Sequence, residues 1–323
     1  MRRRDFIASL SSAAVWPLAA RAQQQQTSLR RIGVLLFSKE DETVIRPLLQ
    51  GLEALGYIDG KTVAIEYRYG EGNPERLVVQ ADELVRHNPE VIFSFGGDLA
   101  PIIKRATSTI PIVVVVSNDP VESGLVASLA RPSGNITGLT YVHDLLAGKS
   151  VELLKDTAPW VSRVAILWNP THADPEFRET QRASRALEVD LQSLELRKPE
   201  DYEPAFEAAL REKAQALIVI GSRQVFLQRQ RVGDFAAKNR LILLGVPRWL
   251  IEIGAVLTYG PNVPELFRRA ATYVDKILKG ARPADLPMQQ PTTFELTINL
   301  KRAKDLGLIV PPTIIARADE VIE

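Results

Sequence analysis

Short, nearly unbroken apolar runs recur along the chain and constrain its fold more than any other feature. Each is four to seven residues long, and stretches of helical period separate them; the runs lie at 31–37, 91–95, 112–116, 164–168, 217–220 and 241–244. Strands buried on both faces have this pattern, whereas half-exposed antiparallel strands alternate apolar and polar residues. The order strand, helix, strand therefore predicts an α/β fold with parallel sheets.

The run pattern occurs twice in the same order. RIGVLLFS in the first half corresponds to RVAILWNP in the second, PEVIFSFGGD corresponds to AQALIVIGSR, and TIPIVVVVSNDP corresponds to NRLILLGVPRW. We therefore expect two similar doubly wound parallel-sheet lobes, at 29–142 and 146–257. One large sheet of eight or more strands is the alternative.

The chain continues beyond the second lobe. We expect the amphipathic helix at 264–279 to pack back on lobe one, 288–307 to return to lobe two, and 308–323 to form a C-terminal tail. Repeated crossings between the lobes would make a multi-crossing hinge. Closure about a few hinge residues is the usual motion of two-lobed binders.

The first 22 residues have the pattern of an export signal. Three arginines at 2–4 precede a short apolar stretch at 6–20, and Ala20-Arg21-Ala22 supplies an A-x-A cleavage pattern. This pattern predicts a signal peptide cleaved near Ala22 and a periplasmic location. Arg3-Arg4 favours the twin-arginine route, and an ordinary Sec signal is the alternative. The absence of cysteine excludes disulfides and a lipid-modified N-terminal cysteine.

Charge and motifs exclude several classes of function. The 40 Lys+Arg and 39 Asp+Glu nearly cancel, which argues against a nucleic-acid or membrane-surface binder. We found no G-x-S-x-G, H-E-x-x-H or G-x-G-x-x-G motif in a suitable place. Without such motifs we predict no cofactor and no catalysis. The three histidines (His87, His143 and His172) are scattered, so we predict no metal site. No later run reaches the roughly 18 apolar residues of a membrane helix, so we predict no membrane insertion.

A ligand of an open α/β sheet lies beyond the carboxyl ends of the strands. Hydroxyl, amide, aromatic, acidic and arginine side chains gather there, which suits a small polar or zwitterionic solute. The candidate ligand-binding residues in lobe one are Ser38, Gly96, Gly97, Asp98, Ser117, Asn118, Asp119 and Tyr141, and those in lobe two are Asn169, Ser222, Arg248, Trp249 and Tyr259.

Several of these candidates also have a structural explanation. Asp98, Asp119 and Ser222 stand where helix N-caps are expected, and a capped helix start still leaves backbone N–H groups for a ligand carboxylate. Asp174 fits a cap in the same way. Trp249 and Tyr259 could equally belong to an apolar interface. Both readings stay open at this point.

Some segments resemble a known family. SFGG followed by TSTIPIVV, then DPVESGLVASLARPSGNITGL, then YGPN, and the ending QPTTFELTINLKRAKDLGLIVPPTIIARADEVIE are similar to bacterial ABC transporter substrate-binding proteins of the periplasmic binding protein type I fold. The resemblance covers essentially the whole mature chain and implies a venus-flytrap mechanism. It also implies a permease in the inner membrane as partner and an amino acid, by default aromatic, as ligand. The stretches around Arg223 and at 247–249 match the family less well.

From these observations we expect a monomeric periplasmic solute-binding protein that performs no chemistry. A sensor that hands its ligand-bound form to a membrane receptor is one alternative. An exported α/β enzyme using Asp98 or Asp119 as acid–base is another. A cytoplasmic repressor is disfavoured, because the signal peptide stands where a DNA-binding head would be.

Overall fold

The computed structural model describes residues 29–39, 41–141, 144–171 and 175–323. The predicted signal peptide lies outside the described residues, as do His143, His172 and Asp174. Among the helices of the described part, none is both long enough and apolar enough to span a bilayer.

Lobe one is built on a five-stranded, all-parallel sheet in the order β2-β1-β3-β4-β5. Its strands are β1 (Arg30–Leu36), β2 (Val63–Tyr69), β3 (Val91–Phe95), β4 (Ile112–Val116) and β5 (Ile136–Thr140). Every residue of β4 and β5 is buried, which agrees with the continuous apolar run of β4. The prediction of a parallel sheet buried on both faces is confirmed for this lobe.

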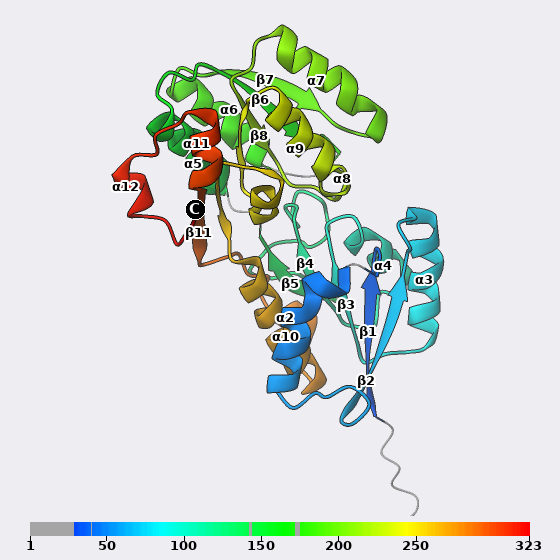
Figure 1. Ribbon diagram of the computed structural model, residues 1–323. Coiled ribbons are helices and arrows are strands. Elements are labelled where there is room, and N and C mark those ends of the chain that lie inside the picture. Colours follow the sequence, from blue (N-terminus) through cyan, green and yellow to red (C-terminus); the bar gives the residue numbers. More distant parts are fainter. Residues whose placement is uncertain (1–28, 40, 142–143, 172–174) are drawn as a thin grey trace, which may run out of the picture.

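Helices cover both faces of this sheet. Helices α2 (Asp41–Ala54) and α10 (Val263–Leu278) pack on one face, and α3 (Pro74–Arg86) and α4 (Ala100–Ala106) pack on the other. Figure 1 shows α10 beside α2 although more than 200 residues separate them in the chain. Gly51 permits this close approach, because a Cβ atom there would lie 2.8 Å from the Cβ atom of Ala271.

Lobe two is built on a seven-stranded sheet in the order β12-β11-β10-β9-β8-β6-β7. The strands from β6 to β10 run parallel to one another, and β11 runs antiparallel to β10. Strand β12 pairs with β11, so the end of the chain belongs to this sheet. The strands are β6 (Arg163–Trp168), β7 (Asp190–Glu195), β8 (Ala216–Val219), β9 (Ile242–Gly245), β10 (Leu257–Pro261), β11 (Phe294–Asn299) and β12 (Glu320–Ile322).

The helices of lobe two also form two layers. On one face lie α5 (Asp144–Thr157), α6 (Glu176–Ala186), α11 (Leu300–Leu306) and α12 (Pro312–Ile315). The other face carries α7 (Tyr202–Arg211), α8 (Arg223–Leu227), α9 (Arg229–Lys238) and the 3-10 helix η2 (Arg248–Ile253). Of the two shorter 3-10 helices, η1 (Pro199–Asp201) precedes α7 in lobe two, whereas η3 (Pro283–Asp285) lies beside β5 of lobe one. Each lobe has its own sheet, so the alternative of one large sheet is wrong.

The chain passes between the lobes after β5, after β10 and before β11, which makes the multi-crossing hinge predicted from the sequence (Figure 1). The crossings are held side by side by backbone bonds. The Thr140 N–H donates to the Gln289 carbonyl at 2.9 Å, and the Asn262 N–H donates to the Thr293 carbonyl at 3.2 Å. The fold is therefore two α/β lobes joined by a hinge, with the carboxyl ends of both sheets facing the space between them.

Candidate functional site

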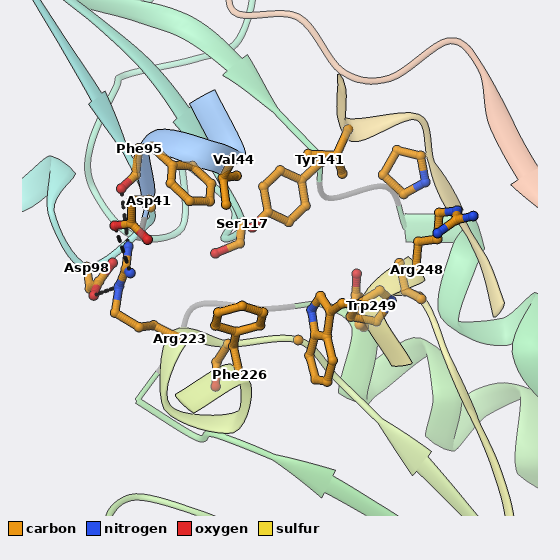
Figure 2. Close-up of a pocket in the computed structure, with 18 residues that line it drawn as sticks. Asp41, Val44, Phe95, Asp98, Ser117, Tyr141, Arg223, Phe226, Arg248 and Trp249 are labelled. Atoms are coloured by element: carbon orange, nitrogen blue, oxygen red, sulfur yellow. Dashed lines mark hydrogen bonds and ion pairs between the residues drawn. The ribbon is translucent and has the colours of Figure 1, made fainter. Parts of the chain in front are cut away.

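A cavity of about 230 Å³ lies between the lobes and is lined by residues of both. Pockets for drug-sized ligands hold roughly 300–1,000 Å³, so this one suits a solute of about amino-acid size. Figure 2 shows the arrangement: aromatic side chains of the two lobes face each other across the cavity, and charged groups lie at its ends.

Three strands of lobe one deliver residues directly to this cavity. Gly96 follows β3, Ser117 follows β4 and Tyr141 follows β5, and all three line the cavity. Parallel neighbouring strands end at the same edge of the sheet, which brings these positions together. Asp98, two residues beyond Gly96, lines the same end of the cavity.

Gly96 has a geometric reason to be glycine. Its φ is +108°, in the left-handed region, where a side chain is strained. A Cβ atom at Gly96 would also lie 2.6 Å from Oδ1 of Asp98 and 2.7 Å from a terminal guanidinium nitrogen of Arg223. The glycine therefore leaves the space in which Asp98 and Arg223 meet.

Arg223, from α8 of lobe two, makes the charged end of the cavity by reaching into lobe one. Its Nε donates to Oδ2 of Asp98 at 2.6 Å, and its Nη1 donates to Oδ2 of Asp41 at 3.3 Å. Nη2 donates to the backbone carbonyl of Phe95 at 3.4 Å. Figure 2 shows these three bonds at one end of the cavity.

The Asp41 carboxylate is held in place by the turn after β1. Its Oδ2 accepts from the backbone N–H groups of Phe37 at 3.1 Å and Ser38 at 3.4 Å. Burial raises the pKa of Asp41, and the nearby Arg223 charge acts in the opposite direction. Ser38 does not line the cavity; its backbone positions Asp41 instead.

Aromatic rings form the two walls of the cavity. From lobe two, Phe226 and Trp249 pack edge to face, with ring centroids 5.5 Å apart and an angle of 78° between the planes. Tyr141 and Phe95 of lobe one lie opposite them in Figure 2, together with Val44 of α2. A planar apolar group between these walls would contact rings on both sides, in the offset or edge-to-face geometries that rings favour.

Tyr141 stands at the centre of the lobe-one wall. Its hydroxyl and the Ser117 side chain share a hydrogen bond. Burial raises the pKa of Tyr141 to about 12, so the hydroxyl is neutral at physiological pH. A neutral phenol beside a serine can both donate and accept hydrogen bonds to a polar solute.

Two further candidates of lobe two line the cavity with partners of their own. Ser222 is the N-cap of α8, and its hydroxyl accepts from the Val225 N–H at 3.3 Å. Arg248 forms an ion pair with Glu320 of β12. Its side chain lies at the opposite end of the cavity from Arg223 (Figure 2). The structure therefore places both as cavity-lining residues with a structural contact as well.

The remaining candidates do not line the cavity. Asn118 is buried against Gly97, whose Cβ position lies 2.5 Å from Oδ1 of Asn118. Asp119 accepts from the N–H groups of Val121 and Glu122 and so stabilises a turn. The last two are Asn169, which accepts from Thr171, and Tyr259, which lies beside Phe294 in lobe two.

Eleven lining residues were missing from the sequence candidates, and those with a charged or aromatic side chain are Asp41, Phe95, Glu176, Arg223 and Phe226. Phe95 and Arg223 could have been included, since Phe95 is the last residue of β3 and Arg223 is the first residue of α8, directly after the candidate Ser222. The other three lie on helices, and no local pattern in the sequence distinguishes them. Among the described residues no group of His, Cys, Asp and Glu is arranged to hold a metal ion.

Comparison with known proteins gives consistent matches over nearly the whole chain. A family model described as ABC transporter substrate binding protein matches residues 32–322. A tyrosine-binding protein of Clostridioides difficile (strain R20291) is 23% identical over 262 residues, which cover 80% of this chain and 75% of the relative.

Solved structures share the fold. A domain from Streptococcus pneumonia in complex with L-Trp has a TM-score of 0.84 and 22% identity, covering 91% of this chain and 100% of its own. The ligand-free, open structure of a substrate-binding protein with adhesive properties from Clostridium difficile has a TM-score of 0.70 and 21% identity, covering 91% and 99%. These likenesses confirm the periplasmic binding protein type I fold.

Proposed function

Because the chain belongs to the ABC transporter substrate-binding protein family, we propose that its lobes close over a zwitterionic solute and deliver it to a membrane permease. An amino acid with an aromatic side chain is the first candidate. The observation that carries this proposal is the cavity itself: rings from both lobes face each other, and charged groups lie at both ends.

The walls suit the ring of the solute, and the polar groups suit its backbone. Asp98 is 41% exposed, and its Oδ1 atom takes no part in the Arg223 bond, so it can accept from an ammonium group. The Ser117–Tyr141 pair and the half-exposed Arg248 guanidinium supply donors for a carboxylate. An aromatic amino acid carries a ring, an ammonium group and a carboxylate within the length of one small cavity.

Binding and release require no chemistry. The family and the relatives that match are solute-binding proteins and not enzymes. Asp119, one of the two carboxylates considered for acid–base catalysis, is bonded within its own turn, and Asp98 is paired with Arg223. What the protein needs is a cleft, a hinge and a higher affinity of the solute for the closed state, which shifts the population of conformations.

We further propose that the protein is exported through its N-terminal signal, is cleaved near Ala22 and acts as a monomer in the periplasm. The A-x-A pattern and the lack of cysteine support this, since a lipid anchor at the N-terminus needs a cysteine. Size-exclusion chromatography of the periplasmic fraction, with mass spectrometry of the N-terminus, tests cleavage site and oligomeric state together.

A thermal-shift screen of the mature chain, beginning at Gln23, tests the ligand class. Amino acids, small carboxylates and sugars are added separately. A solute at 100 times its dissociation constant adds about 2.7 kcal/mol of stability. We expect the largest shifts from L-Trp, L-Tyr and L-Phe. Shifts from sugars with none from amino acids would contradict the proposed ligand class, and turnover of any compound would contradict the proposed binding function.

A further inference from the structure

At the Arg223 end of the cavity, lobe one has the features of a binding site for a guanidinium group. A side chain of lobe two occupies this site. The acceptors are two carboxylates, of Asp41 and Asp98, and the backbone carbonyl of Phe95. All three belong to lobe one, whereas the guanidinium belongs to Arg223 of lobe two.

The acceptors match the shape of this group. Nε, Nη1 and Nη2 of Arg223 each donate to a different acceptor, at 2.6, 3.3 and 3.4 Å. A guanidinium presents its donors in a fixed planar fork, whereas the ammonium of lysine is a compact point charge on a flexible stem. The three-point arrangement therefore selects a planar cation.

Aromatic faces and an absent side chain complete the site. The guanidinium carbon of Arg223 lies 4.5 Å from the ring centroid of Phe37 and 5.8 Å from that of Phe95. Both distances are within the roughly 6 Å over which cations are attracted to ring faces. Gly96 leaves the space for Nη2, since a Cβ atom there would lie 2.7 Å from it.

The site also requires a cation. The Asp41 side chain is only 7% exposed, and that of Arg223 only 15%. Removing one partner of a buried ion pair leaves an uncompensated charge, which costs far more than breaking an exposed pair. When the lobes separate, the same movement takes Arg223 away from both carboxylates, so the site opens to solvent and to any cation in it.

We propose that lobe one carries a guanidinium-binding subsite, and that Arg223 fills it on closure and thereby excludes guanidinium-bearing solutes from the cavity. The inference rests on the proposed closure of the lobes, but not on which solute lies between the rings. Arg223 is then a specificity-determining residue: it reserves the aromatic part of the cavity for solutes without a second cation.

A second ion pair between the lobes provides a matched control. Arg178 of α6 donates to both carboxylate oxygens of Glu122 in lobe one, at 3.0 and 2.8 Å. This pair lies outside the cavity, and its side chains are 60% and 42% exposed. Removing it deletes an arginine between the lobes without vacating the subsite.

The test is binding of methylguanidinium chloride to purified Arg223→Ala, measured by calorimetry with no other solute present. We expect the variant to bind it at least about threefold more tightly than the wild-type protein, because Arg223 occupies the fork in the closed fraction of the ligand-free wild type and the truncation vacates it. Arg178→Ala should behave like the wild type. Adding Asp98→Asn to Arg223→Ala should abolish the gain.

Two results of the binding experiment would overturn the proposal. One is that Arg223→Ala binds methylguanidinium no better than Arg178→Ala does. The other is that it binds tetramethylammonium equally well, which would indicate a general cation effect rather than a planar fork. If the truncation lowers the melting temperature, methylguanidinium should restore it in both Arg223→Ala and Arg223→Gln, and failure to restore it contradicts the subsite.

This readout is independent of the amino-acid screen. If the wild type binds no aromatic amino acid but Arg223→Ala binds methylguanidinium more tightly, the subsite is supported and the proposed ligand class is contradicted. If the wild type binds aromatic amino acids but Arg223→Ala gains no affinity for methylguanidinium, the ligand class is supported and the subsite is contradicted.

Discussion

The two lobes share a core of parallel strands but deliver different halves of the site. In lobe one the lining residues Gly96, Ser117 and Tyr141 follow directly on β3, β4 and β5. In lobe two Phe226 lies on α8 and Trp249 on η2, both beyond the strand ends. Lobe one supplies the carboxylates, and lobe two supplies the guanidinium that pairs with them.

This difference shows why the cavity depends on closure. Neither lobe alone encloses a ring, because the aromatic walls come from opposite lobes, and neither alone satisfies the charges at the Arg223 end. A repeated fold has thus acquired complementary rather than equivalent surfaces. Changes on the two sides should therefore have unequal and distinguishable effects.

The largest effect is expected from removing the main ring of the lobe-two wall. Trp249→Ala deletes one face of the cavity and the edge-to-face contact with Phe226. Truncating a well-packed aromatic anchor costs about 2–4 kcal/mol, so affinity for an aromatic amino acid should fall at least about thirtyfold. Calorimetry with L-Trp measures it.

Trp160→Ala is the matched control, since this tryptophan is 60% exposed and does not line the cavity. The affinity of Trp160→Ala for L-Trp should equal that of the wild-type protein. Equal losses from both substitutions would show that Trp249 acts on stability and not on the solute.

In lobe one, Gly96→Ala should have the next largest effect. It introduces a Cβ atom 2.7 Å from Arg223 at a φ of +108°. Gly56→Ala is the control, since its φ is +88° but no atom of the described residues, apart from Gly56 and its two chain neighbours, lies within 4 Å of the added Cβ. Both should lose about 1–2 kcal/mol of unfolding free energy from backbone strain.

Solute affinity separates the two glycine variants. Only Gly96→Ala displaces charge-assisted bonds between the lobes, each contributing about 1.5–3 kcal/mol, so its affinity should fall about tenfold while that of Gly56→Ala is unchanged. Calorimetry beside chemical denaturation separates the effects. An unchanged affinity in Gly96→Ala would disprove the coupling of the Arg223 contacts to solute binding.

A smaller effect is expected from the exposed pair between the lobes. Exposed ion pairs contribute about 0.2–1 kcal/mol, so Arg178→Ala should weaken binding less than about fivefold, and added salt should remove the difference. Arg178 lowers the pKa of Glu122 below its usual 4.5. A lowered pKa gives stabilisation that is present above pH 4.5 and is lost as the pH falls further. If Arg178→Ala lost as much solute affinity at neutral pH as Gly96→Ala does, this ranking would be contradicted.

The last prediction concerns the protonation of Tyr141, which has no effect on stability at neutral pH because the phenol is neutral there. Its pKa of about 12 lies above the ordinary value of 10, so its contribution to folding is complete below pH 10 and is lost as the pH rises towards 12. The difference in ultraviolet absorbance between wild-type protein and Tyr141→Phe should show one phenol ionising near pH 12. Ionisation near pH 10 would contradict the raised pKa of Tyr141.

The fold followed from the sequence where strands are central and failed where they are at edges. Strands β1, β3 and β4 appear as apolar runs because both faces are covered by helices. Strand β2 has mostly half-buried residues, and β7 has a single buried residue among half-buried and exposed ones. Neither strand therefore has a continuous apolar run in the sequence. Edge strands have a neighbour on one side only and carry more polar residues.

The site was predictable to the extent that strand ends define it. Gly96, Ser117 and Tyr141 could be found because a parallel sheet places its carboxyl ends at one edge. Asp41 and Phe226 depend on how helices pack on the sheets, which local patterns do not contain. Tyr259 was expected at the cavity but lies on the same core face as Leu257, two residues earlier, because side chains alternate along β10.

The central claim is that a solute closes the two lobes over a shared cavity, and a distance between the lobes tests it most directly. The chain has no cysteine, so Glu75→Cys on α3 and Glu207→Cys on α7 give one exposed label site in each lobe. Pulsed electron resonance between two spin labels then reports the separation. We predict that the ligand-free wild type shows both a longer and a shorter distance, that L-Trp or L-Tyr leaves mainly the shorter one, and that ligand-free Arg223→Ala shows mainly the longer one. A solute that binds in calorimetry and leaves the distance distribution unchanged would contradict the account.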